Sequence, residues 1–197
     1  MKEYLYEYAD DIQKAVRTID PIAIMALQNV MQQVILNKTP ILVFGNGGSA
    51  ALAEHMACDW TKGMAQDMQY FSNVISLTTN VPLISAIAND FSYEQIFSKQ
   101  IEYTDFDKCL VIAISSSGNS QNIIEGIKSA TIKGYTVAAL VGFDGGRIVG
   151  ELLAPGLTLH VQAYNYGLVE DSHSLIMHSV AQYFRLAMST EPRNVKL

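Results

Sequence analysis

The chain has 197 residues, of which 49% are hydrophobic and 16% charged, and its formal net charge is -6. This length and hydrophobic content suffice for one well-buried α/β domain, and the length is short for two. The acidic balance argues against nucleic acid or an anionic membrane as a partner. No apolar stretch approaches the roughly 20 residues of a membrane span, and two cysteines, Cys58 and Cys109, fit a reducing compartment. We therefore expect one cytoplasmic domain over residues 1–197.

The N-terminal segment predicts two helices. Apolar residues recur at helical spacing through its first half, at Leu5, Tyr8, Ile12 and Val16. Asp20 followed by Pro21 ends this helix and starts the next. Residues 22–36 are apolar on more than one face, which a helix packed on one side does not require. We expect residues 1–37 to form a helical oligomerisation segment.

Strand and helix patterns alternate from Pro40 onward. Short segments rich in apolar residues predict five strands, at residues 41–44, 74–77, 109–114, 135–141 and 157–161. Helical patterns fill the intervals and close the chain at residues 168–188. Strands that are apolar on both faces are typical of a parallel sheet covered by helices on both sides. The sequence therefore predicts a three-layer α/β sandwich whose ligands bind at the carboxyl ends of the strands.

The third predicted strand runs into a hydroxyl-rich loop that opens a helix. Ser115, Ser116 and Ser117 follow the strand, and Ser120 stands at the N-cap position. The start of a helix leaves backbone N–H groups free and carries partial positive charge, so it binds an anion without a lysine. The hydroxyls can donate further hydrogen bonds to phosphate oxygens. The same pattern also fits a loop whose hydroxyls only cap the helix.

The first predicted strand runs into a second such loop, the segment 45–49, which contains three glycines. Glycine lets the backbone approach a ligand closely, and the helix that follows again offers free N–H groups. The segment lacks the third glycine of the dinucleotide-binding fingerprint at the required spacing, and no acidic residue ends the second strand. We expect a small phosphate or a sugar as the ligand.

Histidine and carboxylate side chains share faces on two helices. His55 and Asp59 are four residues apart, so they are neighbours that can share a metal ion, although such pairs are also common on solvated surfaces. Cys58, beside them, is expected to be a small buried thiol rather than a ligand.

The last helix carries a second polar face, formed by Glu170, Asp171, Ser174 and His178. A polar helix face usually means only contact with solvent. Here both histidine–carboxylate clusters lie near strand ends that suit phosphate, and this coincidence favours a functional site. His160 and His173 are expected to be structural.

The segment 45–49 with His55, the pair Asn89-Asp90, the loop 115–120 and the segment 170–178 together resemble the SIS (sugar isomerase) domain family. Within that family the chain looks like the phosphoheptose isomerases, over almost its whole length. The resemblance implies a single SIS domain with a flavodoxin-like, five-stranded parallel sheet. It also implies a homotetramer with active sites at subunit contacts, and one Zn²⁺ per subunit.

The resemblance assigns roles to residues of this chain. Phosphate binding maps to Ser115, Ser116, Ser117 and Ser120; sugar binding maps to Asn46, Gly47, Gly48, Ser49, Asn89, Asp90 and Glu170; zinc binding maps to His55, Asp59, Glu170 and His178. Asp59 and His178 would act as base and acid, in an order that stays open. Family members usually have Glu at the position of Asp59 and Gln at the position of Glu170. They also usually have an arginine shortly after that Glu, where this chain has Lys62 and Gly63.

The implied reaction converts sedoheptulose 7-phosphate to D-glycero-D-manno-heptose 7-phosphate through an enediolate, for lipopolysaccharide or capsule. Such an isomerisation needs a base, an acid and positive charge near the carbonyl oxygen. Two alternatives stay open: an isomerase of another sugar phosphate, and a non-catalytic SIS protein that binds sugar phosphate or assembles other proteins. The joint presence of acid, base and metal groups favours an enzyme.

Overall fold

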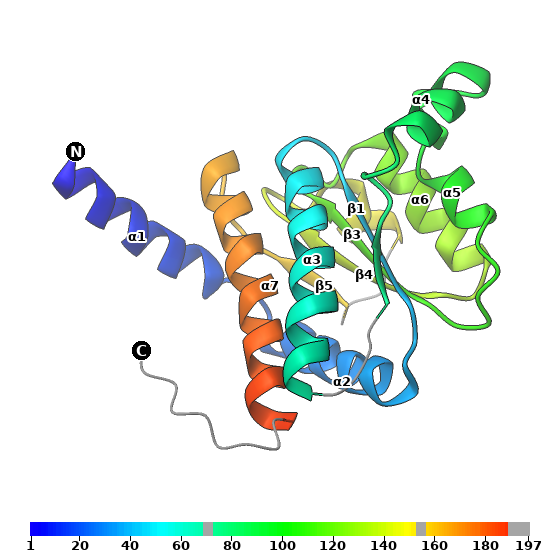
Figure 1. Cartoon of the computed structure of the whole chain (residues 1–197). Coiled ribbons are helices and arrows are strands. Elements are labelled where there is room, and N and C mark those ends of the chain that lie inside the picture. Colours follow the sequence, from blue (N-terminus) through cyan, green and yellow to red (C-terminus); the bar gives the residue numbers. More distant parts are fainter. Residues whose placement is uncertain (69–72, 153–156, 189–197) are drawn as a thin grey trace.

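The computed structural model describes residues 1–68, 73–152 and 157–188 (Figure 1). The elements are α1 (Lys2–Val16), α2 (Pro21–Asn37), β1 (Ile41–Gly45), α3 (Gly48–Met68), β2 (Val74–Ser76), α4 (Val81–Asp90), η1 (Tyr93–Gln95), α5 (Ser98–Glu102), β3 (Leu110–Ser115), α6 (Gln121–Ile132), β4 (Thr136–Val141), η2 (Ile148–Leu152), β5 (Thr158–His160) and α7 (Tyr166–Met188). The predicted alternation of strands and helices is confirmed. Helix α3 extends further than its predicted end at residue 62.

The five strands form one parallel sheet in the order β2-β1-β3-β4-β5. Strands β1 and β3 are neighbours, with Gly45 in register with Ile114. The loops that follow these two strands therefore open at the same edge of the sheet. This edge is the place where the strand order reverses, which is where open α/β sheets bind ligands.

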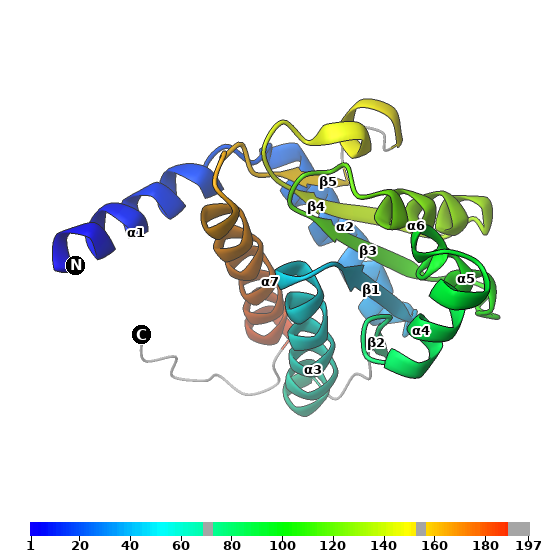
Figure 2. The same ribbon diagram turned by 90° about the horizontal axis from the view of Figure 1, so that it is seen from above.

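Helices cover both faces of the sheet, so the predicted three-layer sandwich is confirmed (Figure 2). Successive strand side chains point to opposite faces. Ile41 and Val43 accordingly pack in the core beneath α2, α3 and α7, whereas Leu42 and Phe44 pack in the core beneath α4, α5 and α6. All residues of β1 and β3 are buried, as their unbroken apolar runs predict.

Helix α1 extends away from the body of the domain (Figure 1). Its residue Leu5 is 61% exposed, and the Tyr8 hydroxyl donates a hydrogen bond to Asp171 of α7 over 2.9 Å. Asp20 caps α2 by accepting a hydrogen bond from the Ile22 amide, as the sequence predicts. Among the described helices none alone is long and apolar enough to cross a membrane; α1 and α2 together meet that test, but they are bent by 77°.

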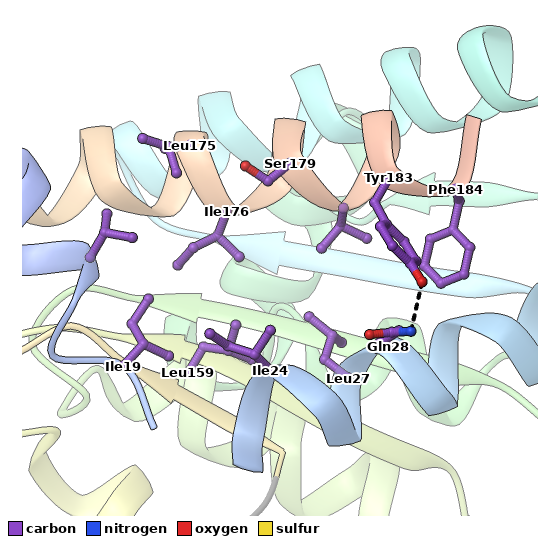
Figure 3. Close-up of a pocket in the computed structure, with 12 residues that line it drawn as sticks. Ile19, Ile24, Leu27, Gln28, Leu159, Leu175, Ile176, Ser179, Tyr183 and Phe184 are labelled. Carbon is purple, nitrogen blue, oxygen red and sulfur yellow. Dashed lines mark hydrogen bonds between the residues drawn. The ribbon is translucent and has the colours of Figure 1, made fainter. Parts of the chain in front are cut away.

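Helix α2 buries one face and exposes apolar side chains on another, which confirms its predicted two-sided character. Leu27 and Met31 lie in the core, whereas Ile22 and Met25 are exposed. An apolar cleft of about 310 Å³ lies between α2 and α7 (Figure 3). The Gln28 amide bridges it by donating to the Tyr183 hydroxyl over 2.8 Å.

Candidate active site

A pocket of about 230 Å³ lies at the carboxyl ends of β1 and β3. Two loops and the start of α7 line it, through Asn46, Gly47, Gly48, Ser49, Ile114, Ser115, Ser116, Ser117, Ser120, Tyr166 and Glu170. The fold thus brings together the two loops that the sequence singled out. Because α3 and α6 both begin at this pocket, two helix N-termini supply free N–H groups and partial positive charge to it.

The serine hydroxyls of the pocket are available to a ligand. The hydroxyls of Ser115 and Ser116 are buried and have no hydrogen-bond partner. Ser120 stands at the N-cap of α6, but its side chain makes no capping hydrogen bond. A buried, unpaired polar group costs about 1–3 kcal/mol, which a bound anion would recover. The geometry therefore favours phosphate binding over the alternative that these hydroxyls only cap the helix.

The serine loop is held in place by the turn that follows β4. The Gly142 amide donates to the Ser116 carbonyl over 2.8 Å, and the Ile148 amide donates to the Gly118 carbonyl over 3.2 Å. Gly118 has a φ of +66°, and a Cβ there would collide with the Gly145 carbonyl. A glycine is needed here both for its conformation and for this close approach.

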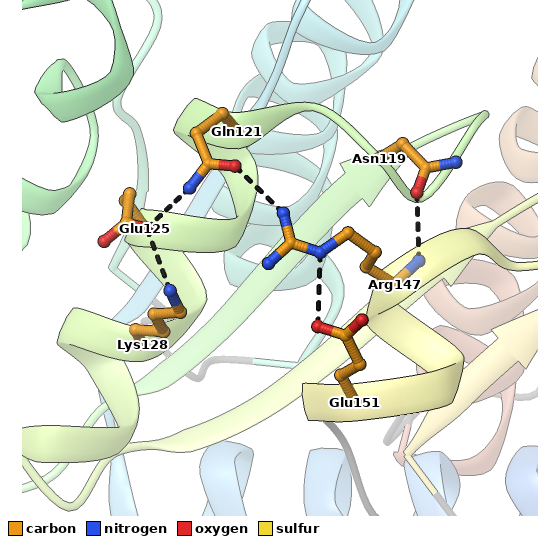
Figure 4. Close-up of polar contacts among 6 residues, drawn as sticks. All are labelled: Asn119, Gln121, Glu125, Lys128, Arg147 and Glu151. Carbon is orange, nitrogen blue, oxygen red and sulfur yellow. Dashed lines mark hydrogen bonds and ion pairs between the residues drawn. The ribbon is translucent and has the colours of Figure 1, made fainter.

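A polar network lies on the outer side of the same loop (Figure 4). Asn119 accepts a hydrogen bond from the Arg147 amide over 3.1 Å. The Arg147 guanidinium donates to Gln121 over 3.0 Å and to Glu151 over 3.2 Å. Within the described part of the chain, no lysine or arginine lines the pocket. Phosphate affinity would therefore come from hydroxyls and helix dipoles, as the hydroxyl-rich loop before α6 predicted.

Glu170 reaches the pocket from α7. A Cβ on Gly48 would lie 2.5 Å from the Glu170 Oε2 atom, so the glycine leaves the space that this carboxylate occupies. The carboxylate lies at the first turn of α3, where the helix dipole favours negative charge.

Three predicted metal ligands converge between α3 and α7. His55 Nε2 and His178 Nε2 are 2.9 Å apart, and Asp59 Oδ2 lies 3.6 Å from each of them. Two imidazoles and a carboxylate are a donor set that catalytic Zn²⁺ takes, and tetrahedral bonds of 2.0–2.1 Å would place ligand atoms about 3.3 Å apart. The observed separations lie on both sides of that value, so these residues fit a zinc ion.

Other predicted site residues lie outside this group. Glu170 is not among the three converging ligands, and its role as a metal ligand stays a prediction. Asn89 and Asp90 are exposed at the end of α4, hydrogen-bonded to each other over 2.8 Å, and do not line the serine pocket. Their contact with a sugar also stays a prediction. The expectation that Cys58 is buried is wrong, since this thiol is exposed.

The remaining histidines lie away from the metal group. His160 contacts the Phe143 carbonyl over 2.9 Å. His173 is fully buried, and burial lowers its pKa to about 4, with the backbone of Val141 acting weakly in the opposite direction. Both positions agree with the structural role expected for them.

Sequence reasoning did not mark Tyr166 and Asn122 as residues of the site. Tyr166, the first residue of α7, lines the pocket, but a single aromatic residue at the start of a helix gives no pattern that marks it. Asn122, whose side chain is buried behind Asn46, follows the serine loop directly and could have been suspected from that position.

A parallel sheet with a serine-lined pocket at its switch point defines the class of protein, and the SIS domain model matches residues 3–142. The chain is 38% identical over 160 residues to a phosphoheptose isomerase of Coxiella burnetii, covering 81% of this chain and 79% of the relative. The solved phosphoheptose isomerase of Neisseria gonorrhoeae is 32% identical with a TM-score of 0.80, covering 92% of this chain and 95% of that one. That of Francisella tularensis is 26% identical with a TM-score of 0.82, covering 92% and 94%. The chain belongs to the phosphoheptose isomerases of the SIS domain family, which are aldose–ketose isomerases.

Proposed function

We propose that this protein converts sedoheptulose 7-phosphate to D-glycero-D-manno-heptose 7-phosphate with one Zn²⁺ per subunit, and so supplies heptose for lipopolysaccharide or capsule. The observation that carries the proposal is the pairing of two features. Unpartnered serine hydroxyls lie in the pocket, and the converging group of His55, Asp59 and His178 lies on the two helices that border it. The curated relatives named phosphoheptose isomerase support the same substrate.

The two features are separated along one helix. His55 follows Gly48 by seven residues, which is about 10 Å along α3. A phosphate held by the serine loop leaves the sugar chain to extend along α3 toward the histidines. Anchoring the phosphate would hold the reacting carbons beside the acid and base and lower the entropic cost of the reaction.

The acid–base chemistry rests on Asp59 and His178. One of them removes the proton beside the carbonyl and the other returns a proton to the neighbouring atom, with an enediolate between the two steps. His55, Asp59 and His178, the three groups that converge, would hold the zinc ion, which when bound would polarise the carbonyl. Glu170, the fourth ligand implied by the resemblance, would have to turn away from Gly48 to join them. A glutamate at position 170, where relatives usually have glutamine, adds negative charge that favours a bound cation.

Deuterium exchange tests this assignment. The protein, loaded with zinc, is incubated with sedoheptulose 7-phosphate in deuterated water, and the proton beside the carbonyl is followed by NMR with and without a chelator. We expect chelator-sensitive exchange and the appearance of heptose 7-phosphate. His178→Ala should lose most of this exchange while keeping the melting temperature of the metal-free protein, because the side chain is 47% exposed. Exchange at the unaltered rate in His178→Ala would contradict its role.

Another sugar phosphate is the second candidate substrate. The side chain of Asp59 is one methylene shorter than the glutamate usual in relatives, which shifts the carboxylate relative to a bound sugar. A panel of ketose and aldose phosphates in the same assay separates the two candidates. Tight binding of sugar phosphate without exchange and without metal would instead indicate a non-catalytic SIS protein.

The assembly that we propose is a homotetramer with active sites at subunit contacts. His55, Asp59 and His178 are each about half exposed, and an enediolate needs protection from water. The cleft between α2 and α7 (Figure 3) and the exposed apolar residues of α1 offer surface for a second copy. Ile24→Glu, in that cleft, should reduce the mass measured by sedimentation, whereas the matched Ile132→Glu on α6 should not. An unchanged mass in Ile24→Glu would exclude the cleft as an interface.

A further inference from the structure

The two loops of the pocket are joined by a pair of asparagine side chains. Asn46 Nδ2 donates to Asn122 Oδ1 over 2.8 Å, and Asn122 Nδ2 donates to Asn46 Oδ1 over 2.9 Å. Asn46 belongs to the loop after β1, whereas Asn122 is the second residue of α6, two residues after Ser120. Asn122 is only 3% exposed and does not line the pocket itself. Its side chain therefore acts through Asn46 rather than on a ligand.

A backbone contact fixes which way round the amide pair is oriented. If the oxygen and nitrogen positions were exchanged in both side-chain amides, the pair would still form two hydrogen bonds of the same geometry. Here the Ile123 amide lies 3.0 Å from the Asn122 side chain, and a backbone N–H can only donate. The contacted atom must therefore be the Asn122 oxygen. This places an oxygen of Asn122 opposite the nitrogen of Asn46, and determines the orientation of both side chains.

The orientation decides what Asn46 can offer to a ligand. An amide oxygen has two lone pairs and an amide nitrogen two hydrogens. The Asn46 oxygen accepts a hydrogen bond from Asn122 over 2.9 Å, and the Tyr93 hydroxyl makes a second, long contact with it over 3.4 Å. The Asn46 nitrogen uses one hydrogen for Asn122 and keeps the other. Asn46 lines the pocket, and it therefore faces the ligand as a donor.

We propose that Asn122 is a positioning residue that holds Asn46 as a hydrogen-bond donor to an oxygen of the sugar. This inference rests on the proposed function, because it names a specificity element of that same pocket. The turn of α6 that begins after Ser120 then contributes to binding of both the phosphate and the adjoining part of the sugar. Its N–H groups and the serine hydroxyls receive the phosphate, and its second side chain orients the group that receives a sugar oxygen.

The test distinguishes an effect on recognition of the sugar from an effect on binding of the phosphate. In Asn122→Ala, kcat/KM for sedoheptulose 7-phosphate is expected to fall about tenfold, as for loss of one well-placed hydrogen bond. The Kd for inorganic phosphate, measured by calorimetry, should change less than about twofold because the serine loop is untouched. Glu125→Ala is the matched control, since Glu125 lies one turn further along α6, does not line the pocket, and hydrogen-bonds with its side chain to Gln121 and Lys128 in the network of Figure 4. It should leave both values unchanged.

A double variant tests whether Asn122 acts through Asn46. In the Asn46→Ala background, Asn122→Ala should cause no further fall in kcat/KM. A full additional tenfold fall there, or a loss of phosphate affinity equal to the loss of kcat/KM in the single variant, would overturn the proposal. If Asn122→Ala does not fold, Asn122→Ser gives the same test, because serine is tolerated in the first turn of a helix but is too short to reach Asn46.

Failure of the proposed function gives a different result. If the unaltered protein does not isomerise the sugar, the comparison is made on Kd values for sedoheptulose 7-phosphate and inorganic phosphate. The positioning role then predicts that Asn122→Ala weakens binding of the sugar phosphate only. Equal weakening of both ligands, or no weakening of either, would refute it.

Discussion

Lowering the pH from 7.5 to 4.5 is expected to destabilise the folded protein through one residue, His173 of α7. Its side chain is fully buried, neither ring nitrogen makes a hydrogen bond of good geometry, and its pKa falls from 6.5 to about 4. Below pH 6.5 the unfolded chain binds a proton at this position that the folded chain does not accept. Stability from this residue is therefore fully present above pH 6.5 and is lost as the pH falls toward 4.

The size of the effect follows from the difference between the two pKa values. Each unit of difference corresponds to about 1.4 kcal/mol once the unfolded state is protonated. Between pH 7.5 and pH 4.5, His173 should remove roughly 2 to 3 kcal/mol from the free energy of unfolding. This is a large part of the roughly 5–15 kcal/mol that stabilises a typical domain.

The assay compares the unaltered protein with His173→Leu, which keeps an apolar side chain of similar size in the same space. Because neither ring nitrogen makes a hydrogen bond of good geometry, the leucine gives up little more than the weak interaction with the Val141 backbone and should cost little at pH 7.5. Guanidinium unfolding at both pH values, at one protein concentration, gives the two free energies for each protein. Effects of all other groups cancel in the difference between them. Equal losses in both proteins on acidification would refute the reasoning.

Three further predictions concern the site. Asp59→Asn should lose most turnover and bound zinc, measured by NMR and metal analysis, and should melt no lower than the unaltered protein when both are free of metal; a zinc-loaded, active variant would contradict this. Ser116→Ala should weaken binding of inorganic phosphate about tenfold in calorimetry yet leave the free energy of unfolding unchanged or higher, since its buried hydroxyl is unpartnered. Gly48→Ala should displace Glu170 and lower kcat/KM. The control is Gly134→Ala, at a position that does not line the pocket; with a φ of +73° and nothing within 4 Å, it should cost only about 1 kcal/mol of stability. Equal kinetic effects of the two changes would exclude the contact with Glu170.

Much of the fold was predictable because its signals are local. The unbroken apolar runs of β1 and β3 could be stable only if they were buried on both faces, and Asp20 before Pro21 determines the start of α2 within one residue. The serine loop could be predicted equally well, since an apolar strand, a short hydroxyl-rich turn and an amphipathic helix follow one another without interruption. Such features depend on neighbours in the sequence.

The parts that were not predicted depend on residues distant in the sequence. The amide pair joins positions 76 residues apart, and neither asparagine carries a signal of the other. The need for glycine at position 118 comes from the Gly145 backbone, which approaches only after β4 has paired with β3. The burial of Cys58 was misjudged because a helical wheel does not give the width of the face that α7 covers.

The SIS domain match ends at residue 142, before the chain reaches β5 and α7. That first part holds the whole serine loop, Asn46 and Asn122, whereas Glu170 and His178 come from the last helix alone. The residues proposed to bind phosphate and half of the residues proposed for the chemistry therefore lie in separate, consecutive stretches of the chain. A related protein can keep the proposed phosphate-binding residues and lose the proposed catalytic ones through changes in α7 alone. When new SIS sequences are sorted into enzymes and binding proteins, the residues of that helix should be read before any overall percentage of identity.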